Sequence, residues 1–147
     1  MNHPQFDHEK LRAYQEALRF AAWIEPIIDK LPSKLSARDQ LDRASTSIVL
    51  NLAEGNGKRS HPDRCRYFDI SRGSALESAA CLDVLVARKK LATEEIVEGK
   101  VVLEAVVSLV AGLIARFGGT VREDSTPYGS ELVENENDQE NENDSPP

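Results

Sequence analysis

Hydrophobic residues recur at three- and four-residue intervals along four stretches of the chain, which is the spacing of one face of an α-helix. The spacing predicts helices over residues 7–30, 36–57, 60–91 and 93–117. The sequence lacks the two-residue alternation that is typical of a strand. Because only short connections separate the four stretches, neighbouring helices are expected to run antiparallel. The pattern therefore predicts an all-α fold, an up-down-up-down antiparallel four-helix bundle.

The first predicted helix carries two apolar stripes, and Asp7 is expected to cap its start. Pro26 lies inside this helix and is expected to kink it, because proline removes one backbone hydrogen bond. Leu31-Pro32 is expected to end it. The stripes consist of Leu11, Tyr14, Leu18, Ala21 and Ile28, and of Ala17, Phe20, Ile24, Ile27 and Leu31.

Polar and small residues mark the ends of the other helices. Ser36 and Asp39 resemble a capping box at the start of the second helix, and Gly55-Asn56-Gly57 is a C-terminal stop signal. Ser60 is expected to cap the third helix, and Thr93 the fourth. The expected core stripes are Leu41, Ala44, Ile48 and Leu52; Phe68, Ser71, Ala75, Ser78, Leu82 and Leu85; and Ile96, Leu103, Val106, Val110, Leu113 and Phe117.

Charge divides the chain into two parts, although the formal net charge is −7 overall. Residues 123–147 hold nine of the 25 acidic residues and none of the 18 lysines and arginines, which leaves residues 1–122 with a charge of +2. The acidic segment has too little apolar surface to offset its ordering entropy. The sequence thus predicts a bundle domain over 1–122 and a disordered acidic tail over 123–147. The tail is expected to aid solubility, or alternatively to mimic nucleic acid and compete for a basic site on the body.

The distribution of apolar residues and cysteines suggests a cytoplasmic protein without a membrane partner. The first ten residues contain no apolar run, so no secretory signal is expected. The apolar stretch 101–117 is interrupted by polar residues and is expected to be too short for a membrane span. Cys65 and Cys81 both fall in the third predicted helix, roughly 24 Å apart, which prevents a disulfide within one chain. Free thiols fit a reducing cytosol.

The sequence offers no complete catalytic or metal-binding constellation. His3, His8 and His61 have none of the paired spacings of a metal site, and neither cysteine has a histidine at local spacing to activate it. The glycine-rich run before Lys58 lacks the spacing of a phosphate-binding loop and follows no strand. We therefore expect no enzyme activity, no cofactor and no metal.

Glu54 and Glu77 are the remaining candidates for chemistry. One interpretation is a carboxylate pair for acid–base work. The favoured interpretation is a buried hydrogen-bond network in which the two carboxylates point inward near Ser47, Asn51 and Ser74 and fix the helix register.

A basic segment is the strongest candidate for binding. Lys58 and Arg59 precede a predicted helix N-terminus, whose free N–H groups attract phosphate, and arginine can bind phosphate with two parallel hydrogen bonds. The alternative is salt bridging, since Arg66 lies three residues from both Asp63 and Asp69. The five basic residues are Lys58, Arg59, Arg64, Arg66 and Arg72.

Two linked motifs carry a family resemblance. Residues 47–60, SIVLNLAEGNGKRS, resemble the S-I-x-x-N-x-A-E-G-x-G-[KR]-x-S run of the four-helix bundle proteins named for the 23S ribosomal RNA intervening sequence. Residues 66–77, RYFDISRGSALE, resemble that family's R-[FY]-[FL]-x-I-A-x-G-S-x-x-E, and residues 9–15, EKLRAYQ, resemble its E-K-L-x-[VA]-[WY]-[QK]. Val49, Ser71 and Asp63 depart from the usual Pro, Ala and Glu. The positions assigned to the structural motif are Ser47, Asn51, Glu54, Gly55, Gly57, Ser60, Gly73, Ser74 and Glu77.

The resemblance implies a four-helix bundle that assembles as a homopentamer and is not known for catalysis. One branch of the family, the accessory variability determinant of diversity-generating retroelements, binds nucleic acid and a reverse transcriptase. The leading hypothesis is therefore a homo-oligomeric accessory protein that binds RNA or DNA through phosphate contacts of the basic segment. The alternative is a protein-interaction scaffold for a partner enzyme such as a reverse transcriptase. A hydrolase that uses Glu54 and Glu77 is the third hypothesis.

Overall fold

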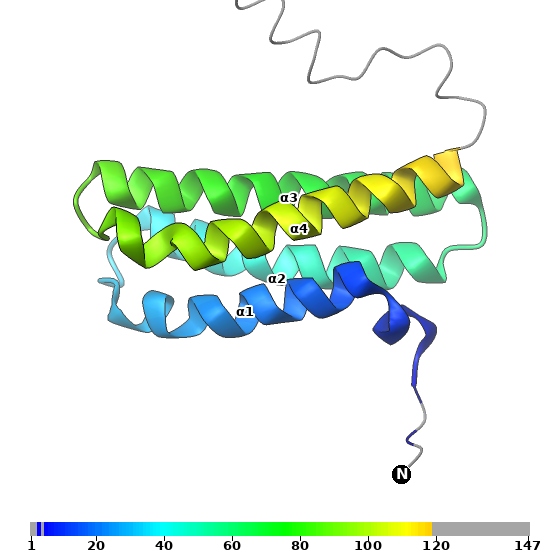
Figure 1. The fold of residues 1–147 in the computed structure, drawn as a ribbon, viewed down its shortest axis with the longest axis horizontal. Helices are drawn as coiled ribbons and strands as arrows, with labels where there is room; N and C mark the ends of the chain where they lie inside the picture. Colours follow the sequence, from blue (N-terminus) through cyan, green and yellow to red (C-terminus); the bar gives the residue numbers. More distant parts are fainter. Residues whose placement is uncertain (1–2, 4, 119–147) are drawn as a thin grey trace, which may run out of the picture. The chain divides into compact units, whose positions relative to one another are not determined.

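The structure, a computed structural model, describes residue 3 and residues 5–118. Consecutive α-helices run in alternating directions (Figure 1), and the described residues contain no strand. The predicted all-α four-helix bundle is confirmed. The predicted disordered tail, residues 123–147, lies outside the described residues. The elements are a 3-10 helix η1 (Asp7–Lys10) and the α-helices α1 (Arg12–Lys30), α2 (Ser36–Gly57), α3 (His61–Ala87) and α4 (Thr93–Gly118).

The core lies between the inner faces of the four helices, as the apolar spacing predicts. Every predicted core residue of α2 and α3 is buried. In α4 the first four predicted core residues are buried, whereas Leu113 and Phe117 near its end are half-buried. The largest fully buried apolar side chains are Phe20, Ile24, Leu41, Ile48, Leu52, Phe68, Leu82, Leu85, Leu103, Val106 and Val110.

The start of the first helix differs from the prediction. A 3-10 turn occupies Asp7–Lys10, and the extended backbone of Leu11 (φ −72°, ψ 128°) separates it from α1. Asp7 does not cap a long helix; its carboxylate instead accepts a hydrogen bond from Asn56. Of the two predicted stripes, the one through Phe20 faces the core, and Leu18 in the other is 45% exposed. α1 continues through Pro26.

The ends of α2 also differ from the prediction. Leu35 occupies the N-cap position without a side-chain bond, so the capping box predicted at Ser36 does not form. The glycines at the other end lie within the helix, which runs to Gly57 before the extended Lys58 (φ −72°, ψ 145°). Gly55 serves close packing, because a Cβ there would lie 2.9 Å from Cε1 of Phe68.

α3 begins as predicted and ends earlier than predicted. The Ser60 hydroxyl accepts from the backbone N–H of Asp63 at 3.2 Å, which confirms the predicted cap. The helix ends at Ala87 rather than near residue 91, and Lys89 takes a left-handed conformation (φ 59°). The N–H of Lys90 then donates to the carbonyl of Leu85 at 2.8 Å, a bond that closes helix ends of this kind.

At the start of α4, Thr93 is the first helical residue rather than the cap. The preceding Ala92 donates its N–H to the Glu95 carboxylate at 2.7 Å. Lys30, at the end of α1, also donates to this carboxylate. The hydrogen bond from Lys30, with that from Ala92 in second place, lowers the pKa of Glu95.

α4 is long and apolar. Among the described residues it is the one helix whose length and composition would allow it to cross a membrane, whereas the stretch 101–117 alone was expected to be too short. A mostly buried core helix can have the same composition, but 22% of the most apolar window of α4 is buried among the described residues. Val102, Leu103 and Val106 are buried in the bundle.

Candidate nucleic-acid interface

The predicted basic segment lies at one end of the bundle, where α2 turns into α3. Lys58 is the C-cap of α2 and Ser60 is the N-cap of α3, so the connection is short. Pro62 has no backbone N–H, and that of Asp63 is bonded to Ser60. The first turn of α3 thus offers phosphate fewer free N–H groups than the sequence suggested. Side chains are therefore the main donors that this end of the bundle offers to an anion.

Two of these cations lie against one aromatic ring. Lys58 Nζ lies 4.8 Å from the ring centroid of Tyr67, and the Arg66 guanidinium carbon lies 5.6 Å from it. Tyr67 itself is half-buried at the contact with α2, where a Cβ on Gly55 would lie 2.9 Å from its own Cβ. Cation–π contacts position a positive charge without neutralising it.

Carboxylates neutralise this cluster only weakly. The predicted salt bridge of Arg66 forms with Asp63, at 3.9 Å between side chains that are 67% and 53% exposed. Exposed pairs of this kind contribute about 0–1 kcal/mol. Neither Lys58 nor Arg59 forms an ion pair with any described residue. The charges of Lys58, Arg59 and Arg66 are therefore available to an external anion.

Arg64 is used inside the protein. Its Nε donates to the carbonyl of Lys58 at 2.8 Å, and its guanidinium carbon lies 4.9 Å from the ring centroid of Phe117 in α4. His61 meets the same ring edge-on at 5.0 Å. Arg64 thus stabilises the connection between α2 and α3 and holds it against the end of α4.

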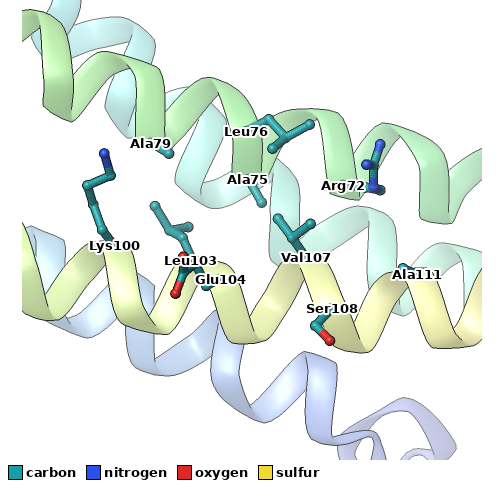
Figure 2. Close-up of a pocket in the computed structure, with 10 residues that line it drawn as sticks. All are labelled: Arg72, Ala75, Leu76, Ala79, Lys100, Leu103, Glu104, Val107, Ser108 and Ala111. Carbon is teal, nitrogen blue, oxygen red and sulfur yellow. The ribbon is translucent and has the colours of Figure 1, made fainter. Parts of the chain in front are cut away.

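Arg72 is separated from the other four cations. It lies six residues beyond Arg66, about 9 Å along the helix and about 120° around it. Its side chain instead lines a groove of about 280 Å³ between α3 and α4 (Figure 2). Contacts with Tyr67 and the Lys58 carbonyl bring Lys58, Arg64 and Arg66 together. Arg59 follows Lys58 in the chain and is exposed, and Arg72 lies outside this group.

The polar residues of the two motifs form a clasp between α2 and α3. The hydroxyls of Ser47 and Ser74 are hydrogen-bonded at 2.8 Å, and Asn51 donates to the Ser47 hydroxyl and carbonyl, both at 2.9 Å. Deeper in the bundle, the Ser71 hydroxyl donates to the carbonyl of Ile48 at 2.8 Å. Three of the residues expected in a polar network between these helices, Ser47, Asn51 and Ser74, therefore form hydrogen bonds there.

The two carboxylates expected in that network are not part of it. Glu54 and Glu77 are both exposed, and within the described residues neither accepts a hydrogen bond from Ser47, Asn51 or Ser74. The expectation that they point inward is wrong, because both are exposed. Each lines a surface groove beside the clasp, Glu54 with Asn51 and Glu77 with Ser74. Gly57 and Gly73 also face outward, where a Cβ would meet nothing within 4 Å.

The cysteines lack the features of nucleophiles. Cys81 is buried, and Cys65 is half-buried with its thiol directed at the carbonyl of Ile114, at 3.8 Å. Burial raises the pKa of both thiols, and nearby Asp69 and Glu77 add to the rise at Cys65 and Cys81 respectively. A raised pKa reduces the reactive thiolate fraction. No group of His, Cys, Asp and Glu side chains within the described residues could hold a metal ion.

The family model of the 23S rRNA-intervening sequence protein matches residues 9–112. The chain belongs to this family. The span shared with the 23S rRNA-intervening sequence proteins contains the whole basic segment and the serine–asparagine clasp. It does not contain Phe6 or Phe117.

A solved structure has a fold similar to that of this chain. It is a protein of unknown function from the S23 ribosomal protein family of Bacteroides thetaiotaomicron. Its TM-score is 0.65 at 21% sequence identity, and the alignment covers 69% of this chain and 97% of that chain. The search of curated proteins gave no match.

Sequence reasoning missed the contribution of the N-terminal turn to this end of the bundle. Asp7 Oδ2 accepts from Asn56 Nδ2 at 2.8 Å, and Asn56 lies two residues before Lys58. No local pattern indicates this contact, because it joins two residues 49 positions apart.

Proposed function

We propose that this protein is a non-catalytic, homo-oligomeric accessory protein that binds nucleic acid through phosphate contacts of Lys58, Arg59 and Arg66. The observation that carries the proposal is the placement of Lys58 and Arg66 against the Tyr67 ring, with no buried carboxylate among residues 5–118 to neutralise them. Cations beside an aromatic ring are typical of surfaces that bind nucleic-acid strands.

We expect a phosphate to displace the Asp63 carboxylate from Arg66. The exposed Asp63 carboxylate is a weak partner for Arg66 at 3.9 Å, and a phosphate can replace it with two shorter charge-assisted hydrogen bonds. Contacts of this kind position a nucleic acid without reading its sequence. The expected ligand is thus RNA or DNA recognised by its backbone.

Several copies of the site in one oligomer would compensate for the small charge of residues 1–122, which is +2 in each copy. Linked sites bind a polyanion more tightly because each further contact is intramolecular. Exposed apolar side chains are available for contacts between copies: Leu50 and Ile70 are 54% and 46% exposed on α2 and α3, and Val97 and Val101 are 56% and 59% exposed on α4. The family resemblance implies five copies.

The test compares two double variants of the full chain that lose the same charge. Arg59→Ala with Arg66→Ala removes two proposed phosphate contacts. Arg88→Ala with Lys90→Ala removes two exposed cations at the opposite end of the bundle (Figure 1). Binding of a structured RNA and of a duplex DNA is followed by fluorescence anisotropy over a range of salt concentrations.

The first pair is expected to weaken binding of both nucleic acids and to lower the slope of log affinity against log salt by about two. The second pair is expected to bind nearly as well as the unaltered protein. Equal affinity of both double variants and the unaltered protein would contradict the assignment of the site.

The groove between α3 and α4 supports a second candidate function, a protein-interaction scaffold for a partner enzyme such as a reverse transcriptase. Figure 2 shows Leu76 of α3 and Leu103 and Val107 of α4 converging on it. An apolar groove between helices suits an amphipathic helix of a partner protein. If the scaffold hypothesis holds, the Arg59/Arg66 double variant retains partner binding in a pull-down, and Leu76→Arg abolishes it.

A further inference from the structure

An exposed aromatic residue lies on the N-terminal turn, whose backbone is hydrogen-bonded. Phe6 is 74% exposed, yet its backbone N–H donates to the carboxylate of Glu9, and the carbonyl of Glu9 accepts from the side chain of Gln15 at 3.1 Å. The Phe6 ring lies parallel to that of His8, with centroids 5.7 Å apart and planes 6° apart. His8 in turn meets Tyr14 edge-on at 4.8 Å. Three rings thus form a row, with Phe6 at its open end.

The N-terminal turn and the start of α1, which carry this aromatic row of Phe6, His8 and Tyr14, lie at the same end of the bundle as the connection between α2 and α3 (Figure 1). The hydrogen bond between Asp7 and Asn56, at 2.8 Å, joins the N-terminal turn to the last turn of α2. Asn56 is buried and lies two residues before Lys58. A strand bound by Lys58 and Arg59 is therefore within reach of Phe6.

Burial does not explain the position of Phe6. A ring that remains mostly exposed gains little from removing apolar surface from water, yet the backbone N–H of Phe6 is bonded to Glu9 and its ring stacks on His8. A flat ring held in place in advance is suited to stacking, because binding then costs little additional ordering. Every nucleobase presents such a flat surface, and aromatic side chains stack on unpaired bases in single-strand-binding proteins.

We propose that Phe6, backed by His8, is a stacking surface for an unpaired base of a nucleic-acid strand whose phosphates are bound by Lys58 and Arg59. The inference rests on the proposed function and narrows its ligand to single-stranded or looped segments. A duplex cannot use the ring, since its bases are already stacked on one another. The carboxylates of Asp7 and Glu9 accept hydrogen bonds from Asn56 and the Phe6 N–H and keep their negative charge. A nucleobase is uncharged, so these carboxylates do not repel a base stacked on Phe6.

The experiment uses the full chain and three fluorescent probes of one length: a single-stranded oligonucleotide, the same strand in a duplex, and an abasic strand with the same phosphates. Three variants are compared with the unaltered protein. Phe6→Ala removes the ring, and Phe6→Trp retains an aromatic surface. Leu18→Ala is the matched control, because it shortens an apolar side chain that is 45% exposed on α1. Circular dichroism and light scattering report on folding and molar mass.

Phe6→Ala is expected to weaken binding of the single strand about 5- to 150-fold, the range for the loss of one stacked base. Its affinity for the abasic strand and the duplex is expected to stay unchanged. Phe6→Trp is expected to bind the single strand at least as well as the unaltered protein, and Leu18→Ala equally well.

Single-strand affinity that is insensitive to Phe6→Ala, or an equal loss for all three probes, would overturn the stacking site while leaving the phosphate site standing. A lower molar mass of Phe6→Ala would place the ring in a contact between copies and would also overturn it. If the unaltered protein binds none of the probes at low salt, both this inference and the proposed function fail.

Discussion

The seam between α2 and α3 and the seam between α3 and α4 share one helix but are built differently. The first is closed by hydroxyl and amide hydrogen bonds of Ser47, Asn51 and Ser74 and by the close approach at Gly55. The second is mostly apolar and has a groove of about 280 Å³ beside Leu76. Both seams carry surface grooves, because Gln40 and Glu77 line grooves of about 360 and 420 Å³ between α2 and α3. The two seams therefore differ in chemistry: the first is the hydrogen-bonded seam and packs beside Tyr67, whereas the second is the apolar seam.

The largest effect is expected from adding a methyl group at Gly55, in the hydrogen-bonded seam between α2 and α3. Gly55→Ala would place a methyl group 2.9 Å from Cε1 of Phe68 and from Cβ of Tyr67. Overpacking of this kind costs about 1–3 kcal/mol, and the displaced Tyr67 is expected to weaken nucleic-acid binding. Urea denaturation and anisotropy measure the two effects.

Gly73→Ala is the matched control, since its methyl group would meet nothing within 4 Å. It is expected to stabilise α3 by about 0.5–1 kcal/mol, because alanine is a better helix former than glycine. Equal stability of the two variants would contradict the close approach of α2 and α3 at Gly55.

The next largest effect is expected for the hydrogen bond between the hydroxyls of Ser47 and Ser74. A double-mutant cycle of Ser47→Ala and Ser74→Ala removes one hydrogen bond of 2.8 Å between the helices. The cycle cancels the helix propensity gained by each alanine, and the expected coupling energy is about 0.5–1.5 kcal/mol. Strictly additive free energies of unfolding would show that this hydrogen bond does not hold the seam.

A smaller effect is expected for the ion pair between Lys100 and Asp83, which crosses the apolar seam between α3 and α4. Lys100 Nζ lies 2.7 Å from Asp83 Oδ1, and the two side chains are 41% and 57% exposed. Because solvent screens such pairs, Lys100→Ala is expected to change the free energy of unfolding by less than about 1 kcal/mol. A loss as large as that of Gly55→Ala would mean that the two seams do not differ as described.

The smallest effect concerns Glu95, which lies outside both seams and joins α4 to Lys30 of α1. Its lowered pKa means that the carboxylate stabilises the fold above the ordinary glutamate pKa, and that this contribution is lost as pH falls through the lowered value. The melting temperature of Glu95→Gln is therefore expected to lie slightly below that of the unaltered protein at neutral pH. The difference should vanish in acid; a constant difference would rule out this linkage.

Periodicity in the sequence predicted the four helices and the core stripes of α2 and α3, because burial on one helix face leaves a repeating apolar pattern. The Ser60 cap was also predictable, since its hydrogen bond is local. The role of Gly55 was not, because a helix stop and a close contact both favour glycine. Only the position of Phe68 on the neighbouring helix distinguishes them.

The angular positions of residues around a helix explain why some predictions at the candidate site were wrong. Residues that cluster in sequence are spread around a helix by about 100° per residue, so Arg72 faces the α3–α4 groove while Arg66 lies beside Tyr67. The same geometry leaves Glu54 and Glu77 exposed. The aromatic row at Phe6 depends on a contact between Asp7 and Asn56 that no local pattern encodes.

A salt titration of RNA binding by the full-length protein, with molar mass measured on the same sample by light scattering, tests the central claim most directly. We expect that a multi-subunit species binds RNA. We also expect log affinity to fall linearly as log salt rises, because lysine and arginine contacts release counterions from the phosphates. Absence of binding at low salt, or an affinity that does not change with salt, would contradict the central claim.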